Sequence, residues 1–338
     1  MESVEKMKCG ERKMNWDLSY TERACRKLES LCVTRYCDKY PAGFEHAGAY
    51  GQMERELSFI ERQGSAPLIL EACEALAAVD ASPKDYFLKG VNGASVVLYI
   101  MGLTELEPLS VTPKVYPEFC FGPDGEKKLS IELVVTGRLF EKLVRYFDNY
   151  AGEARLRHVH DSKGGLYGVC FSDPQRSVGV YDPMEFRFLF SAVSKPNQFA
   201  KRILTGPPFA ELRPETFDNI VKCGCWTSFD DGTWEGNGRE LYRTGTAKPE
   251  DLIANREDVF EYLILHGLDK ETAYHIARDI SLGNVCGNGW DEETLQILNN
   301  AGVPEWYIRS CEKIRGLSSR MHAVTVLTHF GKHAGKGK

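Results

Sequence analysis

The pattern of apolar and polar positions divides the chain into a first half that mixes strands with helices and a second half that is mainly helical. The first strong helical segment runs from Met53 to Ala78. Gly64, Ser65 and Pro67 interrupt it, and residues of these types end one helix or begin the next. The pattern therefore predicts two consecutive helices in this segment.

A strand, a glycine loop and a helix are predicted next, in that order. Asp85 to Leu88 has the length of a short strand, Lys89 to Gly93 forms the loop, and Ala94 to Leu103 forms an apolar helix. Farther along, Ile131 to Val135 is short and β-branched, as strands are. An amphipathic helix should follow, with an apolar face formed by Leu139, Leu143, Tyr146 and Phe147.

From about Tyr181 to Phe330 the pattern is almost wholly helical. Asp269 is a predicted N-cap, and Gly283 should end the helix that covers Thr272 to Leu282. Three prolines are predicted in the first turn of a helix: Pro183 after the cap Asp182, Pro214 and Pro304.

These elements predict an α+β protein with two domains. An N-terminal extension, residues 1 to 50, is charged and weakly periodic. A small mixed domain covers residues 51 to 180, and a mainly helical domain covers residues 181 to 330. Residues 331 to 338 form a basic tail, expected to be a solvated end.

Composition narrows the classes of function. With 338 residues, 43% of them hydrophobic, the chain can bury two modest cores. A formal net charge of −6 argues against a protein that coats nucleic acid through its overall charge, although local basic patches are compatible with it. The longest apolar stretch, Ala94 to Leu103, is too short to cross a bilayer, and the charged first fifteen residues do not form a signal peptide. We therefore expect a cytoplasmic protein without a membrane partner.

Several conspicuous residues are assigned to the core or the surface rather than to chemistry. The eleven cysteines include no C-x-x-C pair, so buried reduced thiols are expected and no metal site is assigned to Cys223 with Cys225 or to Cys32 with Cys37. Four tryptophans at helical spacing are expected in the core: Trp226, Trp234, Trp290 and Trp306. The charged face formed by Glu257, Asp258 and Glu261 is expected to be solvated.

Two segments of the first half resemble the polymerase core of the bacterial PolC-type DNA polymerase III α subunit. Met53 to Gly64 is similar to the helix that opens the family's palm, E-R-L-E-x-E-L-x-x-I-x-x-x-G. Lys89 to Ser95, followed by Gly102 to Leu109, is similar to the family's loop R-G-S-V-G-S-S and its downstream G-I-T-E-V-N-P-L. In the family that loop holds phosphates of the incoming nucleotide. The resemblance implies a nucleotide contact for Lys89, Gly90, Gly93 and Ser95.

The catalytic strand of the family is altered in this chain. Glu118 to Gly137 is similar to the family segment that ends in P-D-I-D-L-N-F-S-G, and the match places Ser130 and Glu132 at its two metal-binding aspartates. Residues two apart face the same side of a strand, which allows D-x-D to hold a pair of Mg²⁺ ions. A single carboxylate on a longer side chain is a poor substitute, so DNA synthesis is not expected.

The family's third aspartate lies in L-x-L-D-I-L-G-H-D-D-P. The chain from Gly137 to Tyr181 is much shorter than the family's equivalent, so most of the thumb is missing, and Gly164 to Val169 is the predicted returning palm strand. Asp173 and Asp182 are the nearest candidates for this aspartate, although neither lies in a matching context.

The second half is similar to the family's fingers domain, with segments in the same order from Arg213 to Ile314. Arg320 to Val326 resembles K-A-H-A-A-A-Y, the fingers helix that faces the nucleotide. A nucleotide contact is therefore implied for Arg320 and His322, while Val326 replaces the tyrosine. The resemblance extends roughly from residue 52 to residue 330 and includes neither the exonuclease nor a clamp-binding motif, so the chain alone is not expected to act as a replicase.

Three functional hypotheses follow from this resemblance. The favoured one is an inactive polymerase-like protein with a reduced palm and a helical fingers domain, which binds primed DNA, nucleotide or a replication protein. The second is an active nucleotidyltransferase in which Glu132 acts with Asp173 or Asp182. The third is a remnant without a ligand. No cofactor is expected, and Mg²⁺ is implied only by the second hypothesis.

Overall fold

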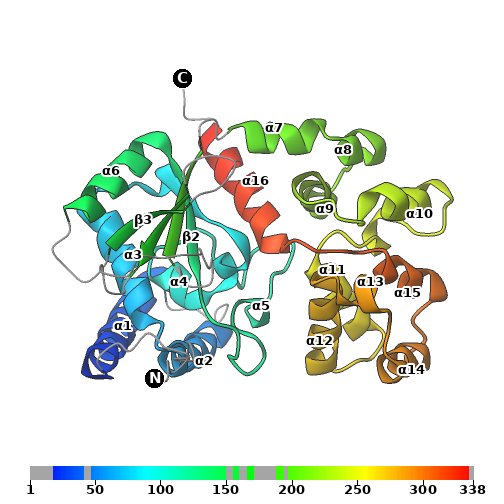
Figure 1. Cartoon of the computed structure of the whole chain (residues 1–338), viewed down its shortest axis with the longest axis horizontal. Coiled ribbons are helices and arrows are strands. Elements are labelled where there is room, and N and C mark those ends of the chain that lie inside the picture. The colour runs from blue at the N-terminus through cyan, green and yellow to red at the C-terminus, as the bar shows by residue number, and fades with distance from the viewer. Residues whose placement is uncertain are drawn as a thin grey trace, which may run out of the picture.

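The computed structural model describes residues 18–41, 47–149, 155–159, 166–170, 188–193 and 197–334. A sheet flanked by helices occupies one side of the molecule, and a set of short helices occupies the other (Figure 1). The predicted α+β class is confirmed. The labels palm and fingers come from the resemblance alone and remain interpretations.

Three helices form the base of the sheet-containing part: α1 (Leu18–Lys39), α2 (Ala47–Gln63) and α3 (Ala66–Ala78). The chain turns between α2 and α3 at Gly64, whose φ of 62° belongs to the left-handed region that favours glycine. The two helices predicted over Met53 to Ala78 are therefore confirmed. In contrast, the segment treated as an extension contains α1, which packs on α3 and buries Leu28 and Cys32 in the core.

Five strands form one sheet in the order β1-β2-β5-β4-β3. Their bounds are β1 Tyr86–Leu88, β2 Ile131–Thr136, β3 Arg155–Val159, β4 Leu166–Cys170 and β5 Phe188–Val193. The central pair, β2 and β5, is parallel, and the other neighbouring pairs are antiparallel. The strand predicted near residues 164–169 exists as β4, but the direct neighbour of β2 is β5. This strand lies beyond residue 180, so the predicted domain boundary cuts through the sheet.

Local sequence explains how β2 is positioned. Its alternate residues Ile131, Leu133 and Val135 are buried, which fixes one face of the strand on the helical base. Thr136 then caps α6 (Gly137–Asp148) through its side-chain oxygen, which accepts a hydrogen bond from the Leu139 amide. The predicted amphipathic helix is confirmed as α6. The predicted helix over Ala94 to Leu103 is shorter and consists of α4 (Val96–Ile100).

The second part of the chain is built from short helices. After α5 (Glu118–Phe121) and the sheet, these are α7 (Asn197–Thr205), α8 (Pro207–Leu212), α9 (Phe217–Ser228), α10 (Arg239–Arg243), α11 (Arg256–Leu265), α12 (Lys270–Ser281), α13 (Asn284–Asn288), α14 (Glu292–Asn300) and α15 (Glu305–Glu312). Asp269 caps α12 and Gly283 follows it, as predicted. The first-turn prediction for Pro214 is wrong, because α9 begins at Phe217 with Thr216 as its cap. Pro304 directly precedes α15, and Asp182 and Pro183 lie outside the described residues.

The last helix, α16 (Arg320–Ala334), returns to the sheet (Figure 1, red). Val326 of α16 forms a small buried cluster with Phe87 of β1, Val134 of β2 and Ile203 of α7. Val134 is two residues from Glu132 and therefore faces the same side of β2. The segment that carries Arg320 and His322 is thus packed beside the sheet face that carries Glu132.

Candidate functional site

Three segments that are far apart in the sequence meet at one edge of this face. The Lys89 amide donates a hydrogen bond of 2.8 Å to the carbonyl oxygen of Glu132, which joins the glycine loop to β2. The next amide, that of Gly90, lies 3.4 Å from Nδ1 of His322 and donates to it. The fold therefore brings together Lys89, Gly90, Glu132 and His322, which the resemblance singled out. The sequence did not predict which of them contact each other.

The side chains of Lys89 and Glu132 form an ion pair. Lys89 Nζ lies 2.6 Å from Glu132 Oε1, and the two side chains are 46% and 26% exposed. Because both remain in contact with solvent, the pair contributes little to the stability of the fold. Its importance is chemical, since the carboxylate that the resemblance places at a metal-binding position already has a cation beside it.

His322 is held in its neutral form. Because Nδ1 accepts the Gly90 N–H, the ring proton is assigned to Nε2. Burial, together with the nearby charge of Lys89, lowers the pKa of His322 to about 4. At neutral pH this ring is therefore a hydrogen-bond donor without charge.

The glycine loop is a 3₁₀ turn, Gly90–Ala94, that packs tightly on α16. Gly90 has a φ of 78°, which favours glycine. A Cβ atom at Gly93 would lie 2.6 Å from the Met321 methyl group, so a larger residue here would force this flexible side chain to shift. The Asn92 side chain also donates a hydrogen bond to the backbone carbonyl of Ser130, and Ser130 is exposed.

Ser95 lies away from solvent and is bound to a carboxylate of the protein itself. Its hydroxyl donates to Glu56 over 2.6 Å and accepts from the Leu98 amide. Glu56, which is fully buried, also accepts the amides of Val96 and Val97. Desolvation raises the pKa of Glu56, while these hydrogen bonds oppose the rise. The donors expected to meet a phosphate at this end of the loop are thus occupied by an internal carboxylate.

Arg320 is likewise held by the protein. Its guanidinium donates to Glu261, with distances of 2.7 and 2.6 Å, and to Asp258 over 2.9 Å. It also reaches the Lys114 carbonyl at 2.7 Å and the side-chain oxygen of Asn255 at 3.3 Å. Burial alone would lower the pKa of Arg320, but the hydrogen bonds to Glu261 and the charge of Asp258 raise it. A nucleotide contact by Arg320 remains a prediction, and the described contacts give its side chain a structural role.

The prediction of a solvated acidic face is wrong. Glu257 is fully buried and accepts hydrogen bonds from the Ser319 hydroxyl and the Arg320 amide, which caps α16. Asp258 is buried between Arg320 and Lys222. A signal was present in the sequence, because Asn255 and Asp258 form a capping box at the start of α11 and such a box turns its acid toward the backbone.

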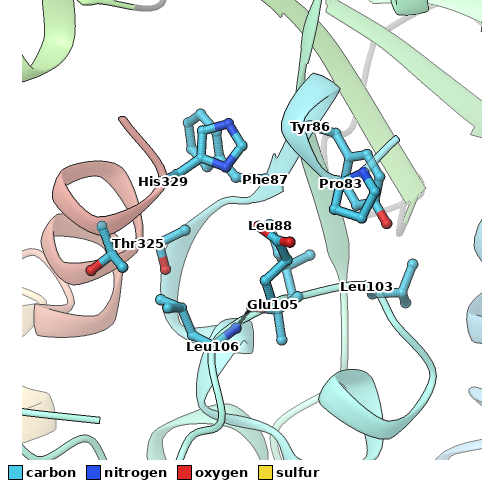
Figure 2. Close-up of a pocket in the computed structure, with 11 residues that line it drawn as sticks. Pro83, Tyr86, Phe87, Leu88, Leu103, Glu105, Leu106, Thr325 and His329 are labelled. Atoms are coloured by element: carbon cyan, nitrogen blue, oxygen red, sulfur yellow. Dashed lines mark hydrogen bonds between the residues drawn. The ribbon is translucent and has the colours of Figure 1, made fainter. Parts of the chain in front are cut away.

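A small cavity lies between α16 and β1 (Figure 2). Thr325 and His329 of α16 line one side, and Phe87 and Leu88 of β1 line the other. Its volume of about 20 Å³ is enough for roughly one water molecule. The Thr325 hydroxyl is buried without a hydrogen-bond partner among the described residues. The cavity is too small to hold a nucleotide.

The cysteines and tryptophans match the prediction only in part, because Cys37 and Cys286 are exposed and Trp290 and Trp306 are only partly buried. Cys223 and Cys225 are buried, and burial raises the pKa of both thiols to about 12. Within the described part of the chain, no group of three His, Cys, Asp or Glu residues could hold a metal ion. Trp226 and Trp234 are buried and contact each other, which confirms the core prediction for these two. No helix in the described ranges is both long and apolar enough to span a bilayer.

Comparisons with known proteins point in one direction. No family model matches the chain. The chain is 34% identical over 114 residues to a PolC-type DNA polymerase III of Caldanaerobacter subterraneus and 32% identical over 114 residues to that of Bacillus subtilis. It is 29% identical over 177 residues to the PolC-type enzyme of Ureaplasma parvum. These matches cover 34%, 34% and 47% of this chain.

The chain is therefore similar in sequence to a small part of a DNA polymerase. Its similarity is to the PolC type of DNA polymerase III in particular. The matches span only 8% of the first two relatives and 12% of the third. The similarity thus concerns a small part of much longer proteins.

Proposed function

We propose that this chain is a catalytically inactive relative of PolC-type DNA polymerase III. It binds the phosphates of primed DNA or nucleotide where Lys89, Glu132 and His322 meet, here called the Lys89 site. The observation that carries the proposal is the ion pair between Lys89 and Glu132 at a position where the resemblance implies a metal-binding carboxylate. A replication protein as partner belongs to the same proposal, because the relatives are DNA polymerases by name.

The loss of synthesis follows from the chemistry of phosphoryl transfer. Two divalent ions stabilise the attacking and leaving oxygens, and several acidic side chains must converge to hold them. Here Ser130 and Glu132 stand at two of the implied positions. For the third, Asp173 and Asp182 are the nearest candidates in the sequence, and neither lies in a matching context.

Phosphate binding requires fewer groups than catalysis. Lys89 supplies an exposed positive charge, Ser130 is exposed two residues before Glu132, and the neutral His322 ring carries a proton on Nε2. Ser95 and Arg320 are assigned to internal contacts, so the proposed binding set is smaller than the set implied by the resemblance. Lys89 is then the principal determinant of binding.

A primer-extension assay with Mg²⁺ or Mn²⁺, paired with a binding assay on the same primed DNA, tests the proposal. We expect binding without incorporation, and weaker binding for Lys89→Met than for the exposed control Lys270→Met. Incorporation that disappears in Glu132→Ala would instead establish the active alternative, which uses Asp173 or Asp182, both outside the described residues. Absence of both binding and a nucleotide-induced thermal shift would leave only the remnant.

A further inference from the structure

The residues at the site do not fit a divalent metal ion. Mg²⁺ requires near-octahedral oxygen coordination and is usually bound by one or two carboxylates together with phosphates and water. Among the described residues, Glu132 is the carboxylate found at this site. Its Oε1 lies 2.6 Å from the Lys89 ammonium group. An ion placed at that oxygen would have to displace Lys89 or lie beside its positive charge.

We propose that the Lys89 ammonium takes the place of the divalent cation, so that this site holds phosphate without a metal ion. The inference rests on the proposed function and specifies its chemistry. Lys89 and Glu132 together are neutral, whereas a pair of carboxylates that holds two divalent ions is positive. The ligand is therefore held by hydrogen bonds and one local positive charge, with Glu132 opposing it.

The geometry keeps the ammonium in position. Lys89 is joined to Glu132 twice, once through its amide to the Glu132 carbonyl at 2.8 Å and once through its side chain at 2.6 Å. The following residue, Gly90, is tied to His322 of α16. An ammonium has three N–H donors, and the described bond to Glu132 uses one of them. The remaining donors are available to phosphate oxygens, because the Lys89 side chain is 46% exposed.

This arrangement reverses the role of the carboxylate. In a metal-dependent site the acid recruits the cation, so its removal weakens phosphate binding. Here Glu132 competes with phosphate for the same ammonium and adds a repulsive negative charge. Glu132→Gln is therefore expected to strengthen binding by about two- to fivefold, the range typical of one exposed charge pair.

The test measures the anisotropy of a fluorescein-labelled primed DNA duplex at constant ionic strength, in excess MgCl₂ or in EDTA. We expect equal affinity in the two buffers, weaker binding by Lys89→Met, retained binding by Lys89→Arg, and stronger binding by Glu132→Gln. Lys270→Met and Glu312→Gln, both exposed and remote from the loop in sequence, are the matched charge controls. Circular dichroism melting curves confirm that each variant is folded.

The outcomes separate this inference from the proposed function. If the wild-type protein binds only in MgCl₂, or if Glu132→Gln weakens binding, the metal-free site is overturned while phosphate binding stands. If the wild-type protein does not bind in either buffer, the proposed function fails and this inference fails with it. A gain in affinity by Glu312→Gln equal to that of Glu132→Gln would show a general effect of net charge and would also overturn the inference.

Discussion

Tyr116 and Glu261, from the two parts of the molecule, are joined by a hydrogen bond of 2.9 Å from the phenol to the carboxylate. The same carboxylate receives two hydrogen bonds from Arg320, which also reaches the Lys114 carbonyl. This buried contact ties the connection before α5 to α11 and to the start of α16. The orientation of α16 on the sheet thus depends on charges that lie outside the Lys89 site.

Arg320→Met should destabilise the protein strongly. Removal of the guanidinium leaves Asp258 and Glu261 without their main partner, and breaking a buried charged contact costs about 3 to 5 kcal/mol. The control Arg309→Met removes an exposed pair with Glu305 and should cost about 0.3 to 0.5 kcal/mol. Urea denaturation of both variants measures the difference, and equal losses would contradict the structural role of Arg320.

Gly93→Ala should destabilise the protein by about 1 to 3 kcal/mol through overpacking against Met321. Because the close atom belongs to a flexible side chain, the double variant with Met321→Ala should recover part of the loss relative to Met321→Ala alone. Gly90→Ala is the matched control, since its cost comes from a φ of 78° and no neighbour lies within 4 Å of the added Cβ. A double-mutant cycle that shows coupling for Gly90 but not for Gly93 would refute this assignment.

His322 should make the protein less stable in acid. The pKa of the folded-state ring is about 4, below its ordinary value of 6.5, so the folded protein binds the proton less readily than the unfolded chain. The stability it contributes is present above pH 6.5 and is lost as the pH falls toward 4. His322→Asn keeps an acceptor for the Gly90 amide but does not titrate, so its free energy of unfolding should fall less over this range. Identical pH profiles would rule out the neutral buried ring.

Ser95→Ala should cost about 1.5 to 3 kcal/mol, because it removes a buried hydrogen bond to the charged or partly charged Glu56 carboxyl. Ser58→Ala on the exposed side of α2 is the control and should stay within about 0.5 kcal/mol. The same two variants should bind primed DNA equally well. A selective loss of DNA binding by Ser95→Ala at unchanged stability would return Ser95 to the phosphate site.

Local patterns were sufficient for elements whose determinants are near in sequence. The α2–α3 break at Gly64, the cap at Asp269, the strand at Ile131 and the amphipathic face of α6 all depend on residues within a few positions of one another. The meeting of Lys89, Glu132 and His322 was anticipated only through the family resemblance. Their separation in the sequence leaves no local signal of contact.

The errors arose where tertiary contacts decide the outcome. Glu257 and Asp258 look like acids on a solvated helix face. Their burial is favourable because Glu257 accepts a hydrogen bond from the buried Arg320 amide at the start of α16, and Asp258 accepts one from the buried Arg320 guanidinium. The strand β5 lies inside the region predicted to be helical, and its place beside β2 depends on parallel pairing across more than fifty residues. The ion pair at Lys89 also could not be predicted, because its partner lies 43 positions away.

The return of α16 has a consequence for biosynthesis. The amide of Gly90 finds its partner in His322, 232 positions later, and Phe87 and Val134 are covered by Val326. During synthesis these apolar groups stay unshielded until α16 has left the ribosome. This face of the sheet therefore matures late, and until then its apolar surface can associate with other chains or with chaperones.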